Sequence, residues 1–204
     1  MVVTEIRKIG KGNRYYLYVD DNLFGIIEAE ILARHHMKQG LDIGEKELEK
    51  IKIENGDYAC FNRGLAVLAK SMKSEKMLRD FLKGKGYPLQ CIDRAIDKLK
   101  EYGYIDDESF CENYIATYSS SKSKRKIKYE LLSKGVDEQI IEEKLATFED
   151  EEEEAVCRRL AEKYLRNKEF DLKTKQKYFN SMLGKGFDYS LILKMWEEIT
   201  NDRD

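Results

Sequence analysis

Apolar residues recur at helical spacing on both sides of three Lys-Gly pairs. Each pair is followed by an apolar residue, giving Lys85-Gly86-Tyr87, Lys134-Gly135-Val136 and Lys185-Gly186-Phe187. Isoleucine stands six positions after every one of these glycines, and apolar residues also stand ten and thirteen positions after it, Phe148 among them. These positions lie one helical turn apart and form one apolar stripe. Apolar residues four and eight positions before each glycine predict a stripe on a preceding helix.

Each Lys-Gly pair therefore predicts a corner between two helices, because glycine readily adopts the left-handed conformation that ends a helix. The corners recur about every 50 residues in one apolar register, which is typical of a tandem repeat. Another corner, Tyr102-Gly103-Tyr104, precedes Asp106 and Asp107, and either aspartate can cap the helix that follows. The predicted structural corner residues are Gly86, Gly103, Asp106, Asp107, Gly135 and Gly186.

The start of the chain has a different pattern. Three runs rich in β-branched and aromatic residues, at 2–6, 14–19 and 23–27, predict strands of a small β-meander. Short helices follow, the last of them over Glu45 to Ile53. Asn55-Gly56-Asp57 then predicts a boundary, since Asn-Gly pairs are typical of turns.

These patterns together predict a mainly α protein in which a small N-terminal β-meander and helix region precedes three three-helix repeats. The expected domains are an N-terminal region at 1–56 and repeats at 57–107, 108–149 and 150–204. The first helix of the first repeat carries Leu65, Leu68, Ala69 and Met72 at helical spacing. Units of this size bury little on their own, so we expect them to stack into an elongated array.

Composition narrows the class of protein. The chain has 204 residues, of which 37 % are charged and 42 % hydrophobic, and a net charge of −2. That charge argues against a protein whose whole surface binds nucleic acid, so such a role needs local segregation of charge. The four cysteines lie far apart, which predicts buried free thiols in a reducing cytoplasm and no zinc site. No segment approaches the length that spans a membrane.

A basic cluster opens the second helix of the middle repeat and is the sharpest surface feature of the sequence. Positive charge there can pair with phosphates or with an acidic protein face, although a solvated helix end would have the same composition. Lys73 and Lys76 offer a weaker second patch, for which ordinary surface lysines are the alternative. Lys134 adds a charge at the middle corner. The cluster consists of Lys122, Lys124, Arg125, Lys126 and Lys128.

Tyrosines in the second predicted strand suggest another kind of contact. Tyr15, Tyr16 and Tyr18 stand near basic residues, an arrangement that can stack nucleobases, although strand tyrosines more often serve in packing. The basic neighbours are Arg7, Lys8, Lys11 and Arg14.

Catalytic patterns are missing from the sequence. It contains no Gly-rich phosphate loop and no arrangement of nucleophile and base. Asp106 and Asp107 could be read as paired catalytic carboxylates, but their place after a glycine corner favours capping. The acidic run 149–154 lacks the spacing of a calcium loop and suits the start of a helix. We therefore expect no catalytic residue, no metal and no cofactor.

Two stretches of the sequence form recognisable signatures: Gly103-Tyr104-Ile105-Asp106-Asp107 with Phe110 and Tyr114 behind it, and the run from Glu130 to Val136. Both resemble signatures of the RecX family, the regulatory proteins of the RecA recombinase. The loop before the basic helix usually contains Gly and Arg in this family, whereas here it is rich in Ser and Lys. The β-rich start resembles an extra N-terminal region that some members carry.

The resemblance implies a non-catalytic regulator that acts in recombinational repair and the SOS response to DNA damage. Such proteins bind filaments of RecA on single-stranded DNA, lodge in the filament groove, and reduce ATP hydrolysis and strand exchange. The implied partner is the RecA filament, with single-stranded DNA reached through it. We expect a cytoplasmic monomer without membrane contact. The alternative is a stand-alone nucleic-acid-binding helical-repeat module, since three-helix units resemble helix-turn-helix domains.

Overall fold

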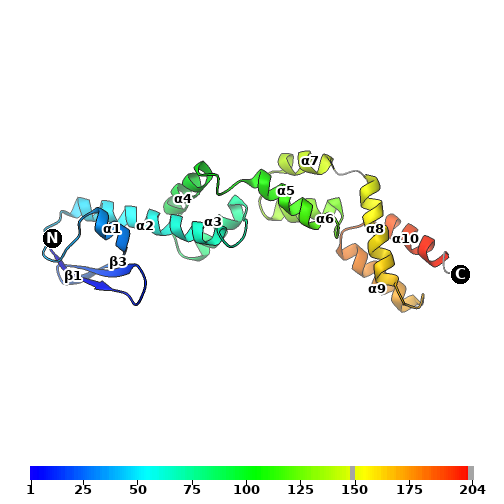
Figure 1. The fold of residues 1–204 in the computed structure, drawn as a ribbon, viewed down its shortest axis with the longest axis horizontal. Helices are drawn as coiled ribbons and strands as arrows, with labels where there is room; N and C mark the ends of the chain where they lie inside the picture. Colours follow the sequence, from blue (N-terminus) through cyan, green and yellow to red (C-terminus); the bar gives the residue numbers. More distant parts are fainter. Residues whose placement is uncertain (148–149, 202–204) are drawn as a thin grey trace. The chain divides into compact units, whose positions relative to one another are not determined.

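The computed structural model of the chain describes residues 1–147 and 150–201. Three strands and ten helices follow one another in this part of the chain (Figure 1). They form two compact units. Unit 1 comprises residues 1–72 and 78–105, and unit 2 comprises 73–77 and the described residues from 106 onward.

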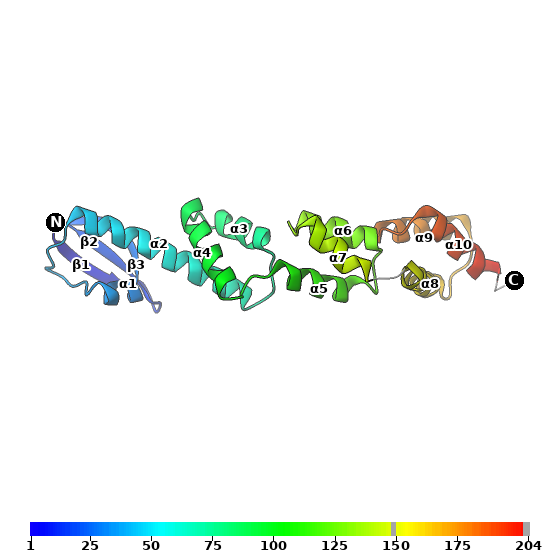
Figure 2. The same ribbon diagram turned by 90° about the horizontal axis from the view of Figure 1, so that it is seen from above.

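The N-terminal sheet of unit 1 has the predicted β-meander. Strands β1 (Val3–Lys8), β2 (Arg14–Val19) and β3 (Asn22–Glu28) pair antiparallel in the order β1-β2-β3. One face of the sheet packs against α1 (Ala29–Arg34) and the first half of α2 (Glu45–Leu68), as Figure 2 shows. The strands and these two helices bury one shared core, which includes Val3, Leu17, Val19, Ile27, Ile31, Leu48 and Ile51.

Helix α2 differs from the sequence prediction. A break was expected at Asn55-Gly56-Asp57, but α2 continues through these residues without interruption. Asn55 is held by β3, because its side-chain amide donates to the Ile26 carbonyl at 3.0 Å and its side-chain oxygen accepts from the Glu28 N–H at 2.8 Å. A Cβ at Gly56 would lie 3.2 Å from Cys91 Sγ, so glycine here serves close helix packing. Tertiary contacts thus override the local turn preference.

The end of α2 also differs from the prediction. The helix stops at Leu68, with Ala69 as its C-cap, and Met72 lies beyond it and is half exposed. The second half of α2 packs against α4 (Leu89–Glu101), and α3 (Glu75–Gly84) completes the first three-helix repeat. The core of this repeat includes Cys60, Leu78, Leu82, Ile92, Ile96 and Leu99.

Unit 2 contains the other two three-helix repeats, each with its own core. The middle repeat has α5 (Asp107–Tyr118), α6 (Lys124–Ser133) and α7 (Glu138–Ala146). The third repeat follows with its three helices. Phe148 and Glu149 lie outside the described residues. The helices of the third repeat are α8 (Asp150–Leu165), α9 (Leu172–Gly184) and α10 (Tyr189–Asn201).

The four cysteines lie in the cores of the repeats. All four cysteines are free and buried, as predicted. Burial raises the pKa of the Cys60 thiol to about 12, which keeps it protonated and unreactive at neutral pH. Among the described residues, no helix combines the length and the apolar character needed to cross a bilayer.

Candidate partner-binding surface

Unit 2 is held together partly by a junction between residues 73–77 and the α6–α7 corner. The fully buried Ser74 hydroxyl donates to the Lys134 carbonyl at 2.5 Å, and Lys76 Nζ donates to the Ser133 carbonyl at 3.1 Å. Gly135 in this corner has a φ of +83°, and a Cβ there would lie 2.5 Å from Lys76 Cβ. The corner therefore needs glycine both for its backbone conformation and for close contact with Lys76.

The same junction recurs one repeat later. The backbone N–H of Ser123, which is also fully buried, donates to the Lys185 carbonyl at 3.0 Å. Gly186 has a φ of +92°, and a Cβ there would lie 2.5 Å from Lys126 Cβ. Two of the sequence-predicted binding residues, Lys76 and Lys126, thus contact the corner of the neighbouring repeat.

The two aspartates after Gly103 cap different helices. The Asp106 carboxylate accepts from the N–H groups of Glu108 and Ser109 at the start of α5. Hydrogen bonds from Ser109 lower the pKa of Asp106. Asp107 accepts from the Glu75 N–H at 2.8 Å, at the start of α3. Both carboxylates therefore hold helix ends in place.

Lys122 of the basic cluster is part of an internal network. Its Nζ lies 2.6 Å from Glu130 Oε2 and 3.9 Å from the centroid of the Tyr118 ring. The Tyr114 hydroxyl donates to the same carboxylate at 2.6 Å. Burial pulls the pKa of Glu130 upward, but the hydrogen bonds from Lys122 and Tyr114 outweigh it, and the pKa is lowered. Lys134 Nζ lies 5.4 Å from the Tyr114 ring centroid and belongs to the same neighbourhood.

Other members of the cluster are also paired with acids, at more exposed positions. Lys128 Nζ lies 2.7 Å from both Glu138 and Glu142, and hydrogen bonds to these two carboxylates raise its pKa. Arg125 pairs with Asp188 at 2.7 Å, with side chains 65 % and 72 % exposed. Exposed pairs of this kind contribute at most about 1 kcal/mol, so Arg125 can exchange its partner at little cost. Lys73 and Lys124 are half-buried.

The outer face of α6 contains two residues that the sequence analysis did not single out. Tyr129 is 68 % exposed and Leu132 is 39 % exposed. With Arg125 they follow the spacing i, i+4, i+7 and share one face of the helix. Lys126 Nζ lies 5.9 Å from the Tyr129 ring centroid. We call Arg125, Tyr129 and Leu132 the α6 outer face. Its signal in the sequence is two apolar residues that fall outside the buried stripe of Ile127 and Leu131.

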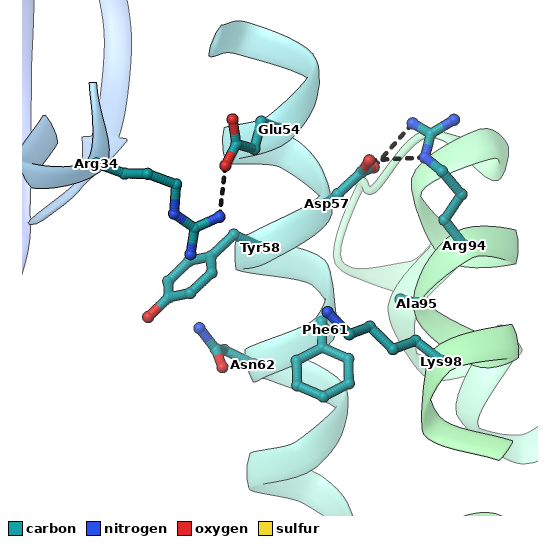
Figure 3. A pocket seen from close by; sticks show the side chains of 9 residues that line it. All are labelled: Arg34, Glu54, Asp57, Tyr58, Phe61, Asn62, Arg94, Ala95 and Lys98. Atoms are coloured by element: carbon teal, nitrogen blue, oxygen red, sulfur yellow. Dashed lines mark hydrogen bonds and ion pairs between the residues drawn. The ribbon is translucent and has the colours of Figure 1, made fainter. Parts of the chain in front are cut away.

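Unit 1 contains a recess of about 360 Å³ between α1, α2 and α4 (Figure 3). Its basic residues are neutralised in part by acids of α2. Arg34 pairs with Glu54 at 2.5 Å, and Arg94 holds Asp57 through two nitrogens at 2.7 and 2.8 Å. Lys98 Nζ lies 5.3 Å from the Phe61 ring centroid. These contacts explain the recess as a tie between three helices.

Comparisons with known proteins identify the repeats. Family models match all three of them: the first three-helix domain of RecX at 60–99, the second at 106–145 and the third at 151–195. The chain is 36 % identical over 194 residues to the regulatory protein RecX of Clostridium perfringens strain SM101, covering 93 % of this chain and 92 % of that protein. It is 34 % identical over 199 residues to the regulatory protein RecX of Clostridium tetani, covering 96 % and 88 %.

Solved structures agree with the fold. A crystal structure of regulatory protein RecX superposes with a TM-score of 0.64 at 23 % identity, covering 96 % of this chain and 98 % of the other. The crystal structure of RecX from Lactobacillus salivarius gives a TM-score of 0.58 at 26 % identity and covers 72 % and 98 %. Fold, repeats and sequence identity over nearly the whole length agree, and the chain therefore belongs to the RecX family of regulatory proteins.

Proposed function

We propose that this protein is a non-catalytic regulator that binds the filament of RecA recombinase on single-stranded DNA and lowers its ATPase and strand-exchange activities. Membership of the RecX family is the observation that carries the proposal. The protein acts as a cytoplasmic monomer in DNA repair and needs no cofactor.

The α6 outer face is the surface that we assign to the filament. Arginine and tyrosine are enriched among the residues that carry most of the binding energy at protein interfaces, and here both are exposed beside a partly exposed apolar leucine. Arg125 leaves Asp188 and pairs with an acidic group or a phosphate of the filament. Four lysines support this face through other contacts: Lys122 and Lys134 in the neighbourhood of Glu130 and Tyr114, Lys126 against Gly186, and Lys128 with Glu138 and Glu142.

The proposal is tested by ATP hydrolysis and strand exchange of RecA on single-stranded DNA, with the protein added from substoichiometric to saturating amounts. We expect both activities to fall before the protein equals RecA in concentration. Normal ATPase and strand exchange at saturation would remove the proposal. The alternative, a stand-alone nucleic-acid-binding module, predicts tight binding to naked duplex DNA with a steep salt dependence and no effect that requires RecA.

A further inference from the structure

The outward face of the N-terminal sheet carries two cross-strand rows of side chains, in each of which a half-buried tyrosine stands between two exposed residues. In the first row, Arg7 of β1 pairs with Tyr16 of β2, which pairs with Ile26 of β3. The second row, one step along the strands, is Glu5, Tyr18 and Leu23. Leu17 and Val19 of β2 point into the core, so Tyr16 and Tyr18, which alternate with them, face away from it.

This face is open to solvent and rich in planar groups. Ile26 is 46 % exposed and Leu23 is 56 % exposed. The Arg7 guanidinium carbon lies 5.6 Å from the Tyr16 ring centroid and 5.2 Å from the Tyr18 ring centroid, and Arg7 also donates to the Tyr18 hydroxyl. Tyrosine rings and a guanidinium plane are the groups on which unpaired nucleobases stack.

Positive charge is concentrated at one end of the face, around the β1–β2 hairpin. Arg14 precedes Tyr16 on the outward side of β2, and Lys8 and Lys11 lie in and beside the hairpin. Two acids share this face: Glu5 lies in the second row, 3.8 Å from Arg7, and Glu28 stands opposite Arg14 at the hairpin end. Arg14, Lys8 and Lys11 outnumber Glu28 at that end, so it can hold phosphates while the rows of tyrosines hold flat rings.

We propose that the outward face of the N-terminal sheet binds a short stretch of single-stranded nucleic acid, with bases on the Tyr16–Arg7–Tyr18 layer and phosphates at the basic hairpin. Tyr16 and Tyr18 are two positions apart, or about 6.7 Å along the strand, which gives successive bases separate stacking sites. Stacking needs no particular base, so the site is tolerant of sequence. A protein partner would also use tyrosine and arginine, but the basic hairpin favours an anionic chain.

The test is fluorescence anisotropy of a 5′-labelled twelve-residue oligothymidylate titrated with the full-length protein, without RecA and at low salt. The variant replaces both tyrosines, Tyr16→Leu with Tyr18→Leu. The matched control is Tyr102→Leu with Tyr104→Leu, because these residues are also two tyrosines two positions apart in unit 1, and at 54 % and 52 % they are more exposed than the half-buried Tyr16 and Tyr18. We expect the sheet variant to bind at least tenfold more weakly and the control to stay within twofold of the unaltered protein.

A second measurement keeps the proposal testable if the sheet variant is poorly folded. Amide chemical-shift changes in the unaltered protein, on titration with oligothymidylate, should concentrate in β1, β2 and the hairpin between them. Equal affinity of the two variants, shifts confined to unit 2, or no binding at 100 µM protein would each overturn it. A folded sheet variant that binds the oligonucleotide normally but no longer binds RecA filaments would instead assign the face to a protein partner. That outcome would leave the regulation of RecA intact and remove only this inference.

Discussion

At the two corners of unit 2, glycine meets two separate requirements. Gly135 and Gly186 have φ values of +83° and +92°, a region that L-residues enter at a cost of about 1–2 kcal/mol. At both corners a Cβ would also collide with a lysine of the neighbouring repeat. Gly86, at the equivalent corner of the first repeat, shares the positive φ but has open space where a Cβ would lie. A comparison of the three corners therefore separates the cost of the backbone conformation from the cost of the packing contact.

Gly186→Ala should therefore destabilise the protein more than Gly86→Ala. We expect about 1–2 kcal/mol for Gly86→Ala from the backbone alone, and roughly 2–4 kcal/mol for Gly186→Ala, because overpacking adds to it. Urea unfolding followed by circular dichroism measures both. Equal losses in the two variants would show that the repeat junction accommodates a methyl group.

The Glu130 network predicts a dependence of stability on pH. The pKa of Glu130 in the folded protein lies below its ordinary value of 4.5. Its ionised form therefore stabilises the fold fully above about pH 4.5, and this contribution is lost as the pH falls through the lower folded-state pKa. Glu130→Gln should cost roughly 1–3 kcal/mol at pH 7 and should make stability fall less steeply below pH 4.5. Parallel pH profiles for the two proteins, from urea unfolding at pH 3 to 7, would contradict this account.

At the scale of elements, α2 shows where local sequence signals lose to tertiary structure. Asn-Gly is a strong turn signal, yet the Asn55 side chain satisfies two backbone groups of β3, and Gly56 lets α4 approach. The sequence around Asn55 and Gly56 does not indicate that β3 and α4 are their partners. The strands, the Lys-Gly corners and the buried stripes were predictable, because each rests on a period or on one conformational requirement.

The substitution Asn55→Ala shows whether helix propensity or the tie to β3 dominates at this position, because the two predict opposite changes in stability. Helix propensity alone predicts that alanine stabilises the helix by about 0.5–0.7 kcal/mol. The tie to β3 predicts a loss of roughly 1–2 kcal/mol, because the Glu28 N–H and the Ile26 carbonyl lose their partner. Thermal unfolding provides the measurement, with Lys52→Ala, an exposed position on the same helix, as the control. A stabilised Asn55→Ala protein would refute the tie.

At the candidate site on helix α6, too, residues from other parts of the chain decide what each side chain does. The basic cluster was evident in the sequence as charge, but its ion partners come from three places: Glu130 of α6 itself, Glu138 and Glu142 of α7, and Asp188 of the third repeat. Which of its lysines serve the fold could not be read from spacing. Tyr129 and Leu132 were visible only as apolar residues outside the buried stripe, and their exposure became evident in the folded helix.

For the whole molecule, the family and its three-helix repeats were predictable from recurring corners and two signature stretches. The partner surface was not, because repeats of one architecture use the same residue types for packing and for binding. Lys126 illustrates this: it belongs to the basic cluster, yet its Cβ contacts the corner of the next repeat. Its Nζ lies 5.9 Å from the Tyr129 ring, so one side chain takes part in both the junction and the surface, and a clean test changes the α6 outer face alone.

The most direct test of the central claim is inhibition of RecA ATPase on single-stranded DNA by a protein carrying Arg125→Glu and Tyr129→Ser. We expect at least tenfold more of this variant to be needed for half-inhibition than of the unaltered protein. A charge-matched control, Lys50→Glu on an exposed position of α2, should inhibit normally. Inhibition by the α6 variant that equals that of the control would contradict the assignment of the α6 outer face to the filament.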